Sequence, residues 1–145
     1  MDLGELAARE AVRDLIARYN ANADSGRFDE VVELFAPDAV LELPGDVHEG
    51  RTAIAAMFRS VRERVVASAP SGVKPHLRHF TATLQIDVDD ADHARSRCYF
   101  AVLMPHGLDH WGTYVDDFVR SDGTWRFARR RVTTDGRREG GSALD

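Results

Sequence analysis

The residues best suited to chemistry in this sequence are histidines, of which the chain has six. An imidazole has an ordinary pKa of about 6.5, so it can take a proton from a carbon next to an activating group and return it near neutral pH. His79 opens a stretch with strand-like alternation, and His106 lies in a Pro-His-Gly turn. Both histidines are therefore candidates for proton transfer.

Other chemistries lack their usual sequence patterns. The chain contains no glycine-rich phosphate loop, no nucleophile elbow and no cysteine paired with a histidine. His76 with His79, and His106 with His110, are isolated pairs without a third ligand at a fixed spacing. We therefore expect neither a metal nor any other cofactor.

Each histidine also has a purely structural interpretation. In a regular strand His79 alternates in phase with Thr81 and Thr83, while the apolar residues occupy the opposite face. His79 would then face solvent, unless the polar face lines a pocket or a β-bulge re-aims the start of the strand. His106 in a turn is ordinarily exposed, although its alternation with Met104 points it toward an apolar side.

The first third of the chain predicts two helices with a carboxylate between them. Apolar residues recur at helical spacing over residues 3–23, and Gly26 supplies the stop. The same spacing over residues 28–35 predicts a short second helix that ends at Pro37. Asp24 therefore lies at the corner between two helices, where a carboxylate ordinarily bonds to the local backbone.

The rest of the chain predicts a third helix and five strands. Helical spacing returns over residues 52–68 and breaks at 70–72. A short stretch rich in branched residues predicts a strand at 39–43. Alternation with a period of two predicts four long antiparallel strands at residues 76–88, 94–104, 111–120 and 124–133.

This order of elements predicts the fold class. Helices followed by a meander of strands are typical of α+β folds, in which the helices cover one face of a curved sheet and leave a pocket between the layers. A chain of 145 residues is the usual size of one domain. We expect a single domain over residues 1–135 and a mobile tail rich in glycine and arginine over residues 136–145.

The charge pattern argues against nucleic acid as a partner. The net charge is −5, from 24 acidic and 19 basic residues without a long block of either sign. The arginines between residues 126 and 138 mostly alternate with apolar residues, as on the solvated face of a strand.

The compartment is predicted to be the cytoplasm. The chain has one cysteine, Cys98, which cannot form an internal disulfide, and its start does not resemble a secretory leader. The longest apolar stretch, residues 98–105, is far shorter than the roughly 20 residues that cross a bilayer, so we expect no membrane partner.

Three local patterns, in this order, resemble the SnoaL-like branch of the nuclear-transport-factor-2-like (NTF2-like) superfamily. They are NADSGRFD with LFAPDA after the first helix, LRHF at the opening of the second strand, and GTY followed by DGTWRF near the end. The resemblance covers about residues 5–135. It implies an NTF2-like (cystatin-like) cone, with three N-terminal helices packed on a curved, mainly antiparallel sheet that encloses a pocket.

The resemblance also implies a catalytic site. Asp24 and His79 resemble the aspartate–histidine pair of the scytalone dehydratase and hexachlorocyclohexane dehydrochlorinase branch. The carboxylate would fix the imidazole tautomer that leaves one ring nitrogen free, and would stabilise the imidazolium. The turn at His106 resembles the place where scytalone dehydratase carries a second pocket histidine. The candidate substrate-binding residues are Tyr19, Leu41, Met57, Phe58, Met104 and Tyr114.

The leading functional hypothesis is a cofactor-independent dehydratase. Its substrate would be a hydroxylated, carbonyl-bearing apolar metabolite, such as a polyketide or a steroid-like ring. An isomerase or polyketide cyclase with the same base, and a ligand-binding module without catalysis, are the alternatives. Relatives of this fold usually pair through the sheet, so the resemblance implies a homodimer.

Overall fold

The computed structural model describes residues 1–69 and 76–142. Three helices lie in this part of the chain, close to their predicted positions: α1 (Leu3–Asp24), α2 (Phe28–Val32) and α3 (Arg51–Ser68). None of the helices in the described ranges is long and apolar enough to cross a membrane. The break predicted at residues 70–72 lies outside the described residues.

The short helix α2 ends earlier than predicted. It stops at Val32, and Phe35, which helical spacing placed in the helix, begins strand β1. Phe35 pairs with Phe127 in the sheet, and the Phe127 amide donates to the Leu34 carbonyl at 2.8 Å. Pairing across the sheet therefore outweighs local helical spacing. Pro37 lies inside β1 at a shift of register, where a residue without an N–H is tolerated.

Six strands form one curved sheet in the order β2-β1-β6-β5-β4-β3. β1 runs parallel to β6, and the other neighbouring strands are antiparallel. The sequence did not predict β2, because its four residues are too few to show an alternation. The strands are β1 (Phe35–Leu43), β2 (Asp46–Glu49), β3 (Arg78–Val88), β4 (His93–Met104), β5 (Gly107–Ser121) and β6 (Thr124–Arg137).

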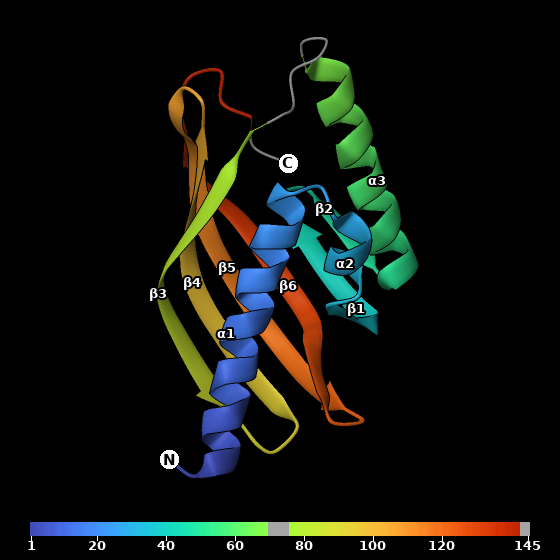
Figure 1. Ribbon diagram of the computed structural model, residues 1–145, viewed down its shortest axis with the longest axis vertical. Coiled ribbons are helices and arrows are strands. Elements are labelled where there is room, and N and C mark those ends of the chain that lie inside the picture. Colours follow the sequence, from blue (N-terminus) through green and yellow to red (C-terminus); the bar gives the residue numbers. More distant parts are fainter. Residues whose placement is uncertain (70–75, 143–145) are drawn as a thin grey trace.

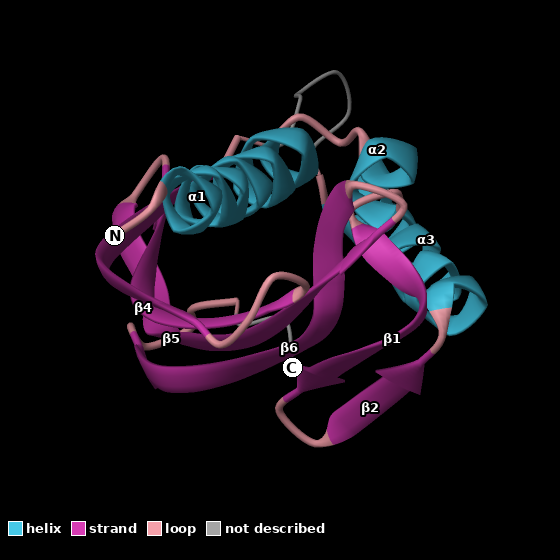
Figure 2. Cartoon of the chain, turned by 90° about the horizontal axis from the view of Figure 1, so that it is seen from below, coloured by secondary structure: helices cyan, strands magenta, loops and turns pink. Residues whose placement is uncertain are grey.

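The helices all lie on the concave side of the sheet. α1 runs along the strands β3 to β6, whereas α2 and α3 lie toward the β1 and β2 side (Figure 1). The view along the molecule shows the sheet curving around the helices (Figure 2). The predicted α+β cone is therefore confirmed.

Two apolar clusters fill the concave side. The larger one joins Val12 and Leu15 of α1 to residues on both sides of the β3–β4 turn, among them Ile86 and Ala94. The smaller one lies nearer the β4–β5 turn. It consists of Cys98, Phe100, Val102 and Tyr114, with Leu77, Leu84, Met104 and Val132 packed against them.

A bulge in β3 decides which way His79 points. His79 pairs with Val102, and Ile86 pairs with Ser96, so β3 presents odd-numbered residues to this face at its start and even-numbered residues later. The phase changes around Thr83, where the register shifts and φ is 59°, a left-handed value that few residues other than glycine adopt. His79 therefore shares the concave face with buried Val102, and the hypothesis of a re-aimed strand is confirmed.

Strand β6 is longer than the predicted strand 124–133, because it continues to Arg137. Gly136 pairs with Trp111, whose ring packs so closely that a Cβ atom at position 136 would lie 2.2 Å from it. The last strand thus needs glycine at this point. Residues 143–145, the end of the predicted tail, lie outside the described residues.

Candidate active site

Asp24 and His79 lie in direct contact, although 55 residues separate them in the sequence. Oδ1 of Asp24 lies 2.6 Å from Nδ1 of His79, and Oδ2 accepts the His79 backbone amide at 2.9 Å. The side chains are only 8% and 14% exposed, respectively. Because Nδ1 faces the carboxylate, Nε2 is the ring nitrogen left for a ligand. Within the described residues no hydrogen bond uses this nitrogen.

Asp24 is the last residue of α1, and the way this helix ends directs its carboxylate toward His79. Gly26, with φ of 73°, turns the chain out of the helix, and the Ser25 hydroxyl donates to the Ala21 carbonyl at 2.8 Å. Serine and glycine therefore close the helix end, and the Asp24 carboxylate bonds across the fold to β3. The interpretation of Asp24 as a residue that bonds to its local backbone does not match this geometry.

Two buried aromatic rings, Phe100 and Tyr114, pack beside His79 and form the floor of the site. The Phe100 ring centroid lies 6.3 Å from that of His79, and Phe100 stacks on Tyr114 with centroids 4.5 Å apart. The Tyr114 hydroxyl donates to Oδ1 of Asn20 on α1 at 3.2 Å. Burial raises the pKa of the Tyr114 phenol well above its ordinary value, so Tyr114 stays neutral. The site thus combines one imidazole with a flat, uncharged floor.

A second carboxylate, Asp109, binds two histidines next to the β4–β5 turn. Its Oδ1 lies 2.9 Å from Nε2 of His106, and its Oδ2 lies 2.8 Å from Nδ1 of His110. Val102 pairs with His110 and the next residue of β4 pairs with Leu108, so Asp109 is the extra residue of a bulge. The bulge allows Asp109 and His110 to be buried together although they are adjacent.

The surroundings keep Asp109 ionised. Burial raises the pKa of its carboxyl group, but the hydrogen bond and charge of His110 and the hydrogen bond of His106 lower it more, so the pKa falls below 3.8. The chain after β6 covers this carboxylate. The Ser142 hydroxyl lies 3.4 Å from Oδ2, and the Arg138 amide donates to the Asp109 carbonyl at 2.9 Å.

Sequence reasoning selected His106 and missed His110. The His106 side chain is 37% exposed, and its Nε2 is turned to Asp109, whereas the His110 side chain is 10% exposed. The predicted strand began only at residue 111, which left His110 in a loop. The adjacent Asp109 and His110 were the available signal, but regular alternation places neighbours on opposite faces.

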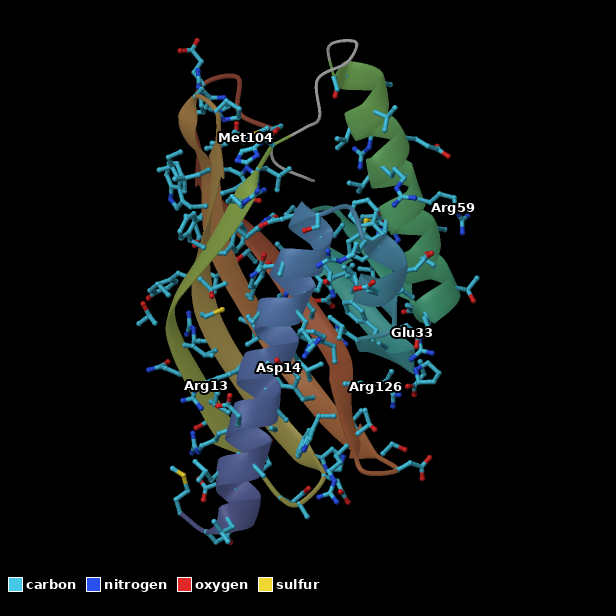
Figure 3. The ribbon with its side chains drawn as sticks, viewed as in Figure 1. Arg13, Asp14, Glu33, Arg59, Met104 and Arg126 are labelled. Carbon is cyan, nitrogen blue, oxygen red and sulfur yellow. The ribbon has the colours of Figure 1, made fainter. Side chains whose placement is uncertain are left out.

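The six candidate substrate-binding residues divide between the site and the core. Tyr114 forms part of the floor. Met104 lies at the end of β4, with its sulfur 3.7 Å from the Ser142 hydroxyl, and Figure 3 shows it near the β4–β5 end of the molecule. The other four pack in the larger apolar cluster: Tyr19, Leu41 and Phe58 are buried and Met57 is partly buried.

A buried ion pair lies beneath the floor, where the sequence predicted a solvated arginine. Arg130 donates from Nε and Nη2 to both oxygens of Asp116 at 2.8 Å, and neither side chain is exposed. The guanidinium carbon lies 3.9 Å from the Tyr114 ring centroid and 4.2 Å from that of Tyr19. The prediction is therefore wrong for Arg130, because one face of β6 is inside the cone.

Two surface hollows lie away from the Asp24–His79 pair. One, of about 350 Å³, is lined by residues that include Asp14, Glu33 and Arg126, which lie well away from Met104 in Figure 3. The other, of about 490 Å³, lies beside the turn between β1 and β2. Neither includes Asp24 or His79. The chemistry of the side chains, rather than the size of a hollow, identifies the candidate site.

The arrangement is suited to proton transfer. Nε2 of His79 can accept a proton, while Asp24 orients the ring and stabilises the resulting imidazolium. Across residues 1–69 and 76–142, no three His, Cys, Asp or Glu side chains are grouped as metal ligands would be.

Comparison with known proteins places the chain in a family. The SnoaL-like domain model matches residues 4–131. An NTF2-like protein with a cystatin-like fold from Novosphingobium aromaticivorans is 30% identical, with 93% of this chain and 92% of that chain covered and a TM-score of 0.73.

Two less identical structures share the fold. A candidate scytalone dehydratase from Novosphingobium aromaticivorans is 19% identical, with 100% of this chain and 94% of that chain covered and a TM-score of 0.81. LinA is also 19% identical, with 99% and 98% covered and a TM-score of 0.80. Together with the family match over residues 4–131, these findings show that the chain belongs to the SnoaL-like family and has its NTF2-like, cystatin-like fold.

Proposed function

We propose that this protein is a cofactor-independent lyase that removes water from a hydroxylated, carbonyl-bearing, largely apolar metabolite of the polyketide or steroid-like kind. The observation that carries the proposal is the 2.6 Å contact between Oδ1 of Asp24 and Nδ1 of His79. It leaves Nε2 as the base, and an imidazole suits proton abstraction next to a carbonyl group at neutral pH.

The proposed reaction consists of proton removal from carbon, loss of the hydroxyl group and its protonation to water. Nε2 of His79 takes a proton from the carbon next to the substrate carbonyl, and the electron pair left behind forms the new carbon–carbon double bond. The bond to the hydroxyl group on the neighbouring carbon breaks, and the hydroxide leaves as water once it receives a proton. The Asp24 carboxylate stabilises the positive imidazolium between these steps.

The neighbours of His79 support an apolar, flat substrate. Phe100, Val102 and Tyr114 form a buried apolar cluster beside the imidazole, and the two aromatic rings in it are stacked. The likeness to a candidate scytalone dehydratase supports the same reaction class.

The test is a comparison of three proteins with a panel of hydroxylated ketones in D₂O, read by mass spectrometry. Wild type and His79→Gln are compared with His93→Gln, whose exposed ring also contacts an aspartate, Asp90, through Nδ1 at 2.9 Å. Loss of water that persists in His93→Gln and disappears in His79→Gln supports the dehydratase. Deuterium uptake without loss of mass indicates an isomerase, and ligand binding without turnover indicates a binding module.

We further propose a homodimer that works in the cytoplasm. The outer face of the sheet exposes large apolar side chains, which a second copy would cover. Light scattering after size-exclusion chromatography checks this, since a monomeric mass would contradict it. These side chains are Phe80, Tyr99, Leu103, Trp111 and Val115.

A further inference from the structure

We infer that His110 is a second proton-transfer residue of the same site, the acid that protonates the departing hydroxyl group. This inference rests on the proposed dehydration. The residue that supplies the leaving group's proton is otherwise missing from that reaction.

The register of three strands places His110 opposite His79. Val102 of β4 pairs with His79 on one side and with His110 on the other. Residues paired in this way lie on the same face of a sheet, and neighbouring strands lie roughly 4.8 Å apart. The backbones of the two histidines are therefore about 10 Å apart on the concave face.

Phe100 lies between the two imidazoles. Its ring centroid is 6.3 Å from that of His79 and 6.1 Å from that of His110, with the His110 ring turned edge-on at 78°. The two imidazoles therefore flank one buried aromatic ring, and a small flat substrate between them would lie against Phe100. Proton removal and proton delivery could then act on opposite ends of it.

Both imidazoles are held by a carboxylate in the same way. Asp24 contacts Nδ1 of His79 at 2.6 Å, and Asp109 contacts Nδ1 of His110 at 2.8 Å. Each ring therefore keeps Nε2 for the substrate, and no hydrogen bond between described residues uses Nε2 of His110. The resemblance-based candidate His106 differs, because its own Nε2 is turned to Asp109.

Asp109 is built to support a positive imidazolium. Its carboxylate is 2% exposed, and the Ser142 hydroxyl and His106 hold it from other sides. Oδ2 of Asp109 lies 2.8 Å from Nδ1 of His110, so the carboxylate orients that ring and faces any positive charge that it carries. Asp109 and His106 are therefore positioning residues that act through His110.

With two histidines, every proton in the proposed dehydration has a donor and an acceptor. His79 gains the proton from carbon, and the His110 imidazolium gives its Nε2 proton to the hydroxide as the carbon–oxygen bond breaks. One water molecule leaves and the substrate gains a double bond. Return of a proton from His79 to His110 through solvent restores the starting state.

Two substrates with different leaving groups distinguish the role of the acid, His110, from that of the base, His79. A β-hydroxytetralone loses water to give a fluorescent naphthol, whereas its β-acetoxy counterpart gives the same naphthol by losing acetate, which leaves without an added proton. Both substrates need the base, but only the hydroxyl substrate needs the acid. Wild type, His79→Gln, His110→Gln and the surface control His93→Gln are compared with both compounds.

For His110→Gln we expect about a 10²–10⁴-fold loss of turnover with the hydroxyl substrate and little change with the acetoxy substrate. His79→Gln should lose turnover with both. Equal losses on the two substrates in His110→Gln, or no loss on either, would overturn the role of His110 alone. Wild type that releases naphthol from neither compound overturns the proposed function and this inference together.

A measurement on the unmodified protein covers the case in which His110→Gln does not fold. α-Tetralone, which has no leaving group, is titrated into wild-type protein while imidazole signals are followed by NMR. Contacts from the ligand to both His79 and His110 support the inference. Contacts to His79 without any to His110 contradict it.

Discussion

The cone contains two kinds of buried charge, and they differ in what they leave unused. Beneath the floor, Arg130 and Asp116 bind each other through two parallel hydrogen bonds, with aromatic rings packed on the guanidinium. Beside the floor, Asp24 binds one nitrogen of His79 and leaves the other for a ligand. The first arrangement satisfies its carboxylate in the interior, and the second keeps a reactive atom available.

This difference separates structural from chemical roles. Arginine stays charged at any ordinary pH, so the Arg130 pair fixes β5 to β6 without exchanging protons. Histidine changes charge near neutrality, so the Asp24–His79 pair can exchange one. Substitutions in the two places should therefore change different observables.

The largest expected effect is on catalysis. His79→Gln should lower turnover by about 10²–10⁴-fold, because a neutral amide cannot act as the base. Its free energy of unfolding should change by only about 1–2 kcal/mol, since the substitution preserves most of the packing. Steady-state kinetics and urea unfolding check the two values. Loss of stability as large as that of the ion-pair variant below would assign His79 a structural role.

The ion pair should show the reverse pattern. Arg130→Met leaves the Asp116 carboxylate buried without its partner, which costs about 3–5 kcal/mol. For a domain of this size the midpoint of thermal unfolding should fall by roughly 6–20 °C. The double variant Arg130→Met with Asp116→Leu removes both charges and should recover most of the loss. A single variant as stable as wild type would refute the structural role.

Asp109 should show a stability contribution that depends on pH. Its folded pKa lies below the ordinary value of 3.8, so its contribution is fully present above that value and is lost as pH falls through the folded pKa. Asp109→Asn should cost about 1–3 kcal/mol at pH 5, where the lost bonds are charge-assisted. Urea unfolding between pH 5 and pH 3 checks this. If the difference in free energy of unfolding between wild type and Asp109→Asn grew toward pH 3, the lowered pKa of Asp109 would be contradicted.

The smallest expected effect is at the bulge that turns His79 inward. Thr83 adopts φ of 59°, which costs a residue with a Cβ atom about 1–2 kcal/mol. Thr83→Gly relieves that cost but makes the unfolded chain more flexible, so a net gain of about 0.5–1 kcal/mol is expected. Turnover should stay unchanged. A loss of stability would show that the Thr83 side chain contributes contacts that offset its backbone conformation.

Periodicity in the sequence was enough to predict most of the fold. The helix over residues 3–23 and the four long strands show clear spacing, and their ends lie within about four residues of the structure, with the largest differences at the start of β5 and the end of β6. Phe35 was misplaced because its strand partner, Phe127, lies 92 residues later in the sequence, and no local pattern reveals such a pairing. The arginine pattern failed at Arg130 for a similar reason, because its partner Asp116 lies on another strand.

The residues of the site were harder to predict from sequence patterns than the helices and strands. His79 required knowledge of a bulge, and alternation alone gave the wrong face. The resemblance to a family pointed to Asp24, where composition and spacing indicated only a helix corner. His110 lay beyond both approaches, because the bulge at Asp109 breaks the alternation that would assign its face.

The role of His79 as the base can be tested directly through the tautomer of its ring in the wild-type protein. Nitrogen-15 NMR at a pH where the ring is neutral distinguishes a proton on Nδ1 from one on Nε2. We expect a proton on Nδ1, hydrogen-bonded to Asp24, and an unprotonated Nε2 available as the base. A proton on Nε2 of the neutral ring would contradict it, because that tautomer has no base to offer the substrate.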